Sequence, residues 1–156
     1  EKQDFYDFVS GIRAGGGGDE PESGLEALAV ALRSKFVEEG DKKRHIIVLF
    51  TDASAHKYEQ QFDGIPVNYP PEMFKNLGEL YQAWESGQGA LGASNSGNHL
   101  MDREAKRLVL FAPSVYPWND LEIDLENVIR KELDKGNGGQ DLDLDDVIAL
   151  VSNSIA

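Results

Sequence analysis

Two unbroken apolar runs dominate the pattern of this chain. Residues 44–51 (RHIIVLFT) and 107–112 (RLVLFA) show no alternation of apolar and polar positions. Runs of this kind are typical of strands buried on both faces, as in a parallel sheet covered by helices. A third, weaker strand is expected at residues 128–133. We predict that the first two runs form adjacent parallel strands, because the residues between them are ample for a crossover.

Apolar residues at helical spacing flank and connect these runs. Before the first strand they fall at Leu25, Leu28, Ala29, Leu32 and Phe36. The same spacing predicts further helices over about residues 3–13, 72–85 and 144–155, and a short helix is expected near residues 99–106. Residues 119–127 fit either a strand or a helix, and we favour a helix. The alternation of helices and strands predicts an α/β fold, a Rossmann-like doubly wound, mainly parallel sheet with helices on both faces.

Acidic residues stand where such a fold holds its ligands. Asp52 directly follows the first strand, and ligands bind beyond the carboxyl ends of strands in open α/β sheets. Asp19 and Glu22 lie at the entry of the helix before this strand, and helix entries and strand carboxyl ends meet at the same edge of a doubly wound sheet. Asp52 fits a turn cap equally well, and Asp19 with Glu22, or Ser23 with Glu26, fits a capping box. We expect Glu22 and Asp52 to converge, with Asp19 near them, and close carboxylates repel unless a cation lies between them.

Two other acidic or glycine-rich segments fail as sites. The glycines at residues 15–18 are followed by two acids instead of the Gly-Lys-Ser/Thr of a phosphate loop. Asp141, Asp143 and Asp145 imitate an EF-hand, but Asp146 stands where glycine is required and Ser152 where a bidentate Glu is required. We read these aspartates as a solvated helix start, capped by Asp143 or Asp145.

Composition narrows the function. The chain has 156 residues, enough for one domain, with 15 Lys+Arg against 28 Asp+Glu and a net charge of −13. This charge repels phosphate backbones and disfavours nucleic acid. There is no cysteine, which excludes disulfides and thiolate ligands and fits a reducing compartment without proving one. No apolar stretch approaches the roughly 18 residues of a membrane span. Serine-hydrolase elbows, H-E-x-x-H and zinc spacings are also missing from the sequence.

Three segments resemble a von Willebrand factor type A domain: residues 17–32, 43–56 and 106–114. More narrowly, Asp19-x-Pro21-Glu22-x-Gly24-Leu25 followed by Thr51-Asp52-Ala53-x-x-His56 resembles the A-like domain inserted in integrin β subunits. The resemblance implies a metal-ion-dependent adhesion site for Mg²⁺, or for Ca²⁺ or Mn²⁺. It assigns Glu22 to the second ligand loop, Asp52 to the third, and Asp19 with the Pro21 carbonyl to a neighbouring cation site. An acidic residue of a protein partner would complete the shell.

The first ligand loop of that family, D-x-S-x-S, would precede Glu1. The nearest match, residues 52–56, has His56 in its last position and occupies the third-loop place. The resemblance therefore implies that residues 1–156 are the C-terminal portion of a single domain, incomplete at its N-terminus. Upstream residues, or another chain by swapping, would complete it. We expect weak or no metal binding in this chain and firm Mg²⁺ binding once the upstream loop is present.

The favoured hypothesis is a non-enzymatic, divalent-cation-dependent protein-binding module, used in adhesion or as a scaffold. One alternative is a metal-dependent hydrolase that uses the same carboxylates. Another is a metal-free structural domain whose acids only cap helices. A metal titration would distinguish the metal-free domain from the two metal-binding hypotheses. Turnover of generic phosphoester or peptide substrates would distinguish the hydrolase from the protein-binding module. Partner specificity is expected in residues 56–71 and 86–98.

Overall fold

The computed structural model describes residues 3–4, 7, 11, 20–34, 36–37, 39–40, 42–58, 68–70, 73–86 and 101–155. Its strands are β1 (His45–Phe50), β2 (Lys106–Ala112) and β3 (Val128–Glu132). Its helices are α2 (Gly24–Leu32), α3 (Leu77–Ser86), α4 (Trp118–Asp124) and α5 (Leu144–Ile155). The chain therefore has an α/β fold, with helices and strands alternating as the sequence predicted.

The three strands form an open, all-parallel sheet in the order β1-β2-β3. His45 pairs with Lys106 at one end of the β1–β2 ladder, and Phe50 with Phe111 at the other. The prediction that the two apolar runs are adjacent parallel strands is confirmed, and so is the third strand. Within the described part of the chain, β1 is an edge strand whose only neighbour is β2.

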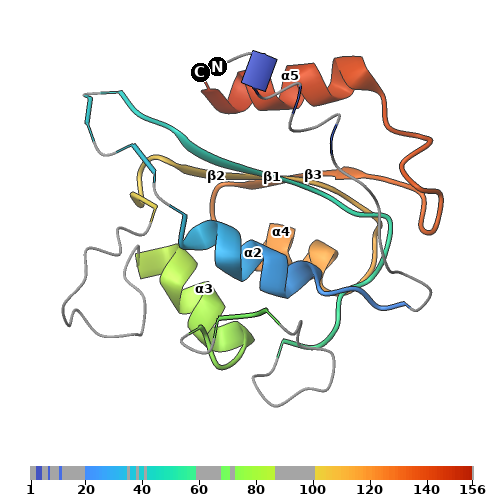
Figure 1. The fold of residues 1–156 in the computed structure, drawn as a ribbon, viewed down its shortest axis with the longest axis horizontal. Coiled ribbons are helices and arrows are strands. Elements are labelled where there is room, and N and C mark those ends of the chain that lie inside the picture. Colours follow the sequence, from blue (N-terminus) through green and yellow to red (C-terminus); the bar gives the residue numbers. More distant parts are fainter. Residues whose placement is uncertain are drawn as a thin grey trace.

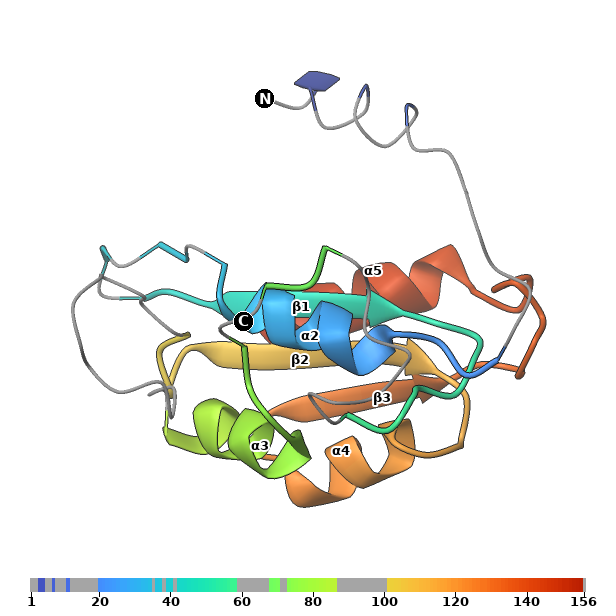
Figure 2. The same ribbon diagram turned by 60° about the horizontal axis from the view of Figure 1, so that its bottom comes forward.

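Helices cover both faces of the sheet, as Figure 1 shows. Helices α2, α3 and α4 lie on one face, and α5 lies on the other. Figure 2 shows the three strands side by side, with α2 nearest β1 and β2. The larger core holds the buried residues of α2, α3 and α4 together with alternate residues of β1 and β2. The smaller core holds Val109, Phe111 and Leu133, with Val147 and Leu150 of α5 packed against them.

Strand β1 divides its side chains between these two cores. Ile47 is buried in the larger core and Leu49 packs against it, while Ile46 and Val48 pack against the smaller core. Leu28 and Leu32 belong to the same cluster as Ile47, so the predicted inward face of α2 is confirmed. This two-sided burial explains why the strand reads as a continuous apolar run.

Two helix boundaries differ from their predicted positions. Helix α3 begins at Leu77 rather than near residue 72, because the Glu79 N–H donates to Asn76 Oδ1 (3.0 Å) and the Lys75 N–H donates to Glu79 Oε2 (2.8 Å). These two bonds cap the start of the helix. Helix α2 ends at Leu32 rather than continuing to Phe36, whose ring stacks on His45 with centroids 4.9 Å apart.

The prediction of a short helix near residues 99–106 is wrong for those of its residues that the structure describes. Residues 103–105 form turns, and β2 already begins at Lys106. Asp102 forms a single turn: its Oδ1 accepts the Glu104 N–H (2.9 Å), and its carbonyl accepts the N–H groups of Ala105 and Lys106. The turn goes no further because Lys106 already pairs with His45 in the sheet.

The remaining expected elements either agree or lie outside the described residues. Helix α4 resolves the ambiguity of residues 119–127 in favour of a helix, and α5 has the expected bounds. Most of the helix expected over residues 3–13, the glycines at 15–18 and residues 87–98 of the expected loop lie outside the described residues.

At the amino edge of the sheet, a lysine joins α3 to β2. Lys106 is 1% exposed, and its ammonium donates to the carbonyl of Trp84 in the last turn of α3. Its Nζ also lies 4.9 Å from the centroid of the Trp84 ring, within range of a cation–π contact. Burial lowers the pKa of Lys106.

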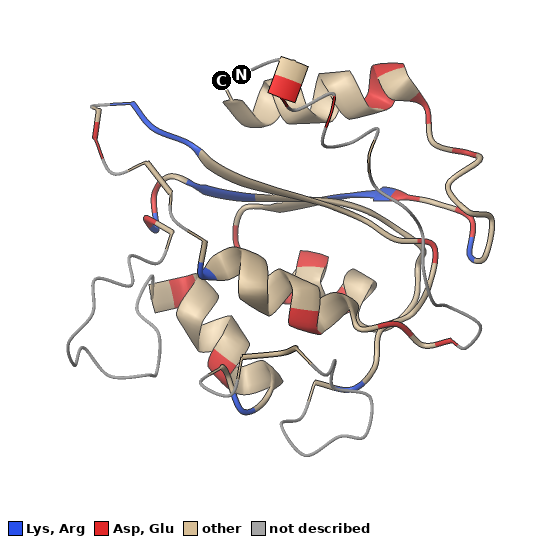
Figure 3. Ribbon diagram, viewed as in Figure 1, with Lys and Arg blue, Asp and Glu red and all other residues tan. Residues whose placement is uncertain are grey.

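The four described helices contain no Lys or Arg, whereas each strand contains a basic residue. His45 is the basic residue of β1, and Lys and Arg occur in β2 and β3 (Figure 3). The charged residues of these helices are therefore all acidic. Among the described helices, none combines the length and apolar character needed to cross a bilayer.

Leu28→Ala should destabilise the protein by about 2–5 kcal/mol, because truncation leaves a cavity in the larger core. The matched control is Leu144→Ala, the same change on α5. Leu28 is 1% exposed and Leu144 is 70% exposed, so the control should change the free energy of unfolding by less than about 0.5 kcal/mol. Urea denaturation measures both, and equal losses would contradict the assigned inward face of α2.

Candidate functional site

Glu22 is tied by its backbone to the segment that follows β1. Its N–H donates to the Ser54 carbonyl (2.9 Å), and its carbonyl accepts the His56 N–H (2.8 Å). These bonds form an isolated parallel bridge between Glu22 and Ala55. The residues just before α2 and just after β1 therefore lie side by side, with Glu22 on one segment and Asp52 on the other.

Asp52 is held by the turn that follows β3. The Gly138 N–H donates to Asp52 Oδ2 (2.6 Å), and the Gly136 N–H donates to the Asp52 carbonyl (2.7 Å). Gly136 and Gly138 have φ of 71° and 60°, a left-handed backbone that other residues rarely adopt. The Gly138 N–H thus orients the Asp52 carboxylate, while the Gly136 N–H holds its backbone carbonyl.

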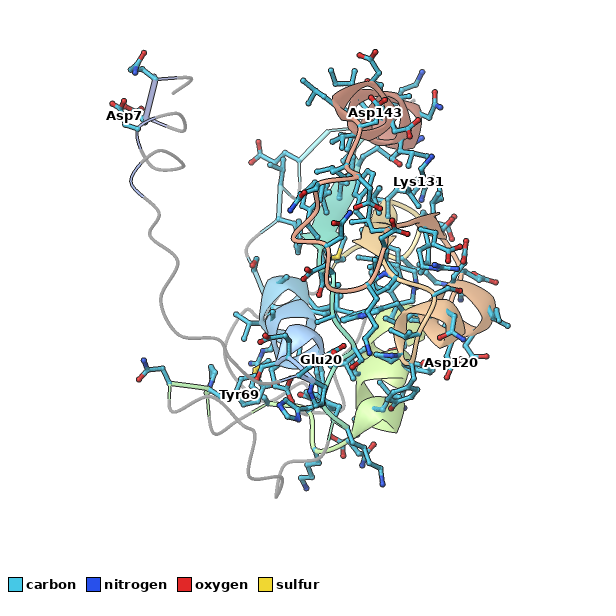
Figure 4. The ribbon with its side chains drawn as sticks, turned by 90° about the vertical axis from the view of Figure 1, so that its right-hand side faces the viewer. Asp7, Glu20, Tyr69, Asp120, Lys131 and Asp143 are labelled. Carbon is cyan, nitrogen blue, oxygen red and sulfur yellow. The ribbon has the colours of Figure 1, made fainter. Side chains whose placement is uncertain are left out.

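Glu20 is a third acid at this edge, and the sequence interpretation did not assign it. Its Oε1 accepts the Ser54 N–H and hydroxyl, both at 3.2 Å, and lies 2.8 Å from Lys135 Nζ. The hydrogen bond from Lys135 is the main cause that lowers the pKa of the Glu20 carboxyl, followed by the Ser54 N–H. Figure 4 labels Glu20 on the α2 side of the sheet, away from Asp143 beside α5.

The turn after β3 is the part of the site that sequence reasoning missed. Lys135, Gly136 and Gly138 contact Glu20 and Asp52, which lie far away in sequence. The only signal was the glycine-rich composition of residues 136–139, which predicts a turn but not its contacts. Asp19, the third assigned ligand, lies outside the described residues.

The proposed capping roles of the acids have mixed outcomes. Ser23 is the N-cap residue of α2 but makes no side-chain cap bond, so the expected Ser23–Glu26 capping box is wrong. Glu26 instead turns into the core, where it is 2% exposed. At α5, by contrast, Asp143 Oδ1 accepts the Asp145 N–H (2.7 Å), which confirms Asp143 as a cap.

Glu26 is a buried carboxyl one helical turn beyond Glu22. Neither of its oxygens has a hydrogen-bond partner in another described residue. Burial raises the pKa of Glu26, and the nearby His56 acts in the opposite direction. The Tyr58 hydroxyl is hydrogen-bonded to that of Tyr69 and donates to the Phe74 carbonyl (3.0 Å). Burial is the main cause that raises the pKa of Tyr58, and the charge of Glu26 acts in the same direction.

The carboxylate oxygens at this edge are suitable ligands for a hard cation, but they are few in number. Carboxylate oxygens are the ligands that Mg²⁺ and Ca²⁺ prefer. Within the described ranges, however, no three His, Cys, Asp or Glu side chains gather closely enough to hold a metal ion. Glu22 and Asp52 would therefore supply only part of an octahedral shell.

Lys135→Met should raise the pKa of the Glu20 carboxyl toward its ordinary value, because it removes the main interaction that lowers it. A depressed folded-state pKa stabilises the fold above the unfolded pKa, and this contribution is lost as pH falls through the folded pKa. The variant should therefore lose less stability over that acidic range.

Carbon-detected NMR titration of Glu20 measures this shift. The control is Lys131→Met, which breaks a pair with Asp146 (2.7 Å) beside α5 and should leave the Glu20 titration unchanged. An identical Glu20 titration in the parent and in Lys135→Met would refute the contact.

Comparisons of the chain with protein-family models, with curated proteins and with solved structures returned no match. The function is therefore argued from the residues and from the geometry of this edge.

Proposed function

We propose that this chain is a divalent-cation-dependent protein-binding module, without enzymatic activity, whose metal site lies at the carboxyl edge of the sheet. Glu22 and Asp52 would hold the ion, preferably Mg²⁺, and Asp19 would belong to the same edge. A bound ion would offer an open position to an acidic side chain of a protein partner. The chain's own residues would orient the two carboxylates and leave that position accessible.

One observation carries the proposal: the backbone bridge between Glu22 and Ala55. It brings a carboxylate residue before α2 next to the segment that begins with Asp52. The sequence motifs that resemble the adhesion-site loops thus lie on adjoining segments. The negative charge of the chain supports a cationic ligand, since like charges raise the local concentration of counter-ions.

We further propose that the sheet is part of a doubly wound fold of the von Willebrand factor A type. The parallel order β1-β2-β3 and the helices on both faces support this proposal. In such a fold a further strand, carrying the D-x-S-x-S loop, would pair with the outer edge of β1. That loop would provide the remaining oxygen ligands.

A metal-free structural domain is the second candidate, and the protein contacts of two acids at this edge favour it. Glu20 is paired with Lys135, and Asp52 accepts the Gly138 N–H, so both acids already have protein partners. Such contacts stabilise carboxylates without a cation. Metal binding therefore decides between the two candidates.

Manganese binding to the parent should be weak but measurable from the loss of the free Mn²⁺ signal in electron paramagnetic resonance, and Mg²⁺ should compete. Glu22→Gln and Asp52→Asn keep the side-chain shape but remove a charge, and each should weaken binding by about tenfold or more. Glu104→Gln, an exposed acid at the opposite edge, is the control and should bind like the parent.

Equal affinity in the parent and both site variants would favour the metal-free domain. Metal-dependent turnover of phosphoester or peptide substrates, lost in the same two variants, would instead indicate the hydrolase.

A further inference from the structure

Trp118, the first residue of α4, contacts both segments of the candidate site. Its side chain is fully buried, with 0% exposure. The indole Nε1–H donates to the Ala53 carbonyl at 2.7 Å. Ala53 directly follows Asp52, so one edge of the indole is bonded to the segment after β1.

The adjoining edge of the same ring, next to the N–H, lies against the start of α2. A Cβ atom placed on Gly24 would be 2.7 Å from Trp118 Cη2 and 2.8 Å from Cζ2, well inside van der Waals contact. The same atom would be 3.9 Å from the Ala55 side chain. Gly24 follows Glu22 by two residues, so the indole touches both the segment before α2 and the segment after β1, which are bonded directly to each other.

We infer that Trp118 is a positioning residue that sets the separation of Glu22 and Asp52. This inference rests on the proposed metal function. The indole is a rigid plate whose Nε1–H is hydrogen-bonded to one segment and whose neighbouring Cζ2–Cη2 edge contacts a glycine of the other, so it supports the two bonded segments from one side. A metal ion requires its oxygen ligands within a narrow range of distances, and a shift of either segment therefore lowers affinity.

Trp84 provides a matched control within the same chain. It is also buried, at 2% exposure, and its Nε1–H donates to a backbone carbonyl, that of Glu126, at 2.8 Å. It lies at the end of α3, beside Lys106 at the amino edge of the sheet. Trp84→Phe and Trp118→Phe thus remove equivalent groups, one at each edge.

The test compares Mn²⁺ affinity in Trp118→Phe and Trp84→Phe at a temperature where both are folded. Trp118→Phe should bind about tenfold more weakly than the parent, as expected when an outer-shell partner is lost. Trp84→Phe should bind within about twofold of the parent, because distant sites act independently. Hydrogen exchange at the His56 and Gly138 amides, which bond to Glu22 and Asp52, should accelerate more in Trp118→Phe.

Gly24→Ala is a second variant, which pushes against the indole instead of removing its hydrogen bond. Its methyl group must displace the indole, so it should also weaken Mn²⁺ binding. The control is Gly78→Ala at the start of α3, where the new methyl group would meet only the Asn76 side chain, at 3.2 Å. This control should bind Mn²⁺ like the parent.

The outcomes separate the inference from the function it rests on. If the parent binds Mn²⁺ through Glu22 and Asp52 but Trp118→Phe binds as Trp84→Phe does, Trp118 is only a core residue and the inference fails alone. If the parent does not bind Mn²⁺, or binds it independently of Glu22 and Asp52, the proposed function and the inference both fail.

Discussion

The whole structure depends on β2 being paired on both sides and covered on both faces. Six of its seven residues are buried, and its two faces contribute to different cores. Strands β1 and β3 each have β2 as their described neighbour, and α5 packs against the face that α2, α3 and α4 leave open. Because burial is two-sided, β2 leaves little room for polar substitution.

The candidate site arises where this rigid sheet ends and short backbone contacts begin. The Glu22 bridge, the turn after β3 and the Trp118 indole approach the segment after β1 from three parts of the chain. Each uses backbone groups of residues 52–56, so this short segment joins all three. The Glu22 and Asp52 segments are therefore fixed mainly by main-chain hydrogen bonds, whereas the Glu20 carboxylate is held by the Lys135 ammonium and by Ser54.

The sequence was informative where the structure obeys a local pattern. Continuous apolar runs predicted β1 and β2, and helical spacing predicted α2 and α5. Individual polar bonds, such as the cap that Asn76 provides for Glu79, moved a boundary, because a single side chain can outweigh propensity at the end of an element. The roles of Lys135 and Trp118 were not predictable, since their partners lie far away in sequence: 65 residues separate Trp118 from Ala53.

The contact of Lys106 with the last turn of α3 has a consequence for the helix as a whole. Helix α3 has no basic residue in its last turn, so nothing within it balances the partial negative charge of its carbonyl end. Lys106 supplies that positive charge from the first position of β2. The helix end and the strand start are consequently joined by a direct bond, whatever path the intervening residues take. Lys106 thus links the end of α3 to the start of β2 by an electrostatic contact, at the edge of the sheet opposite the candidate site.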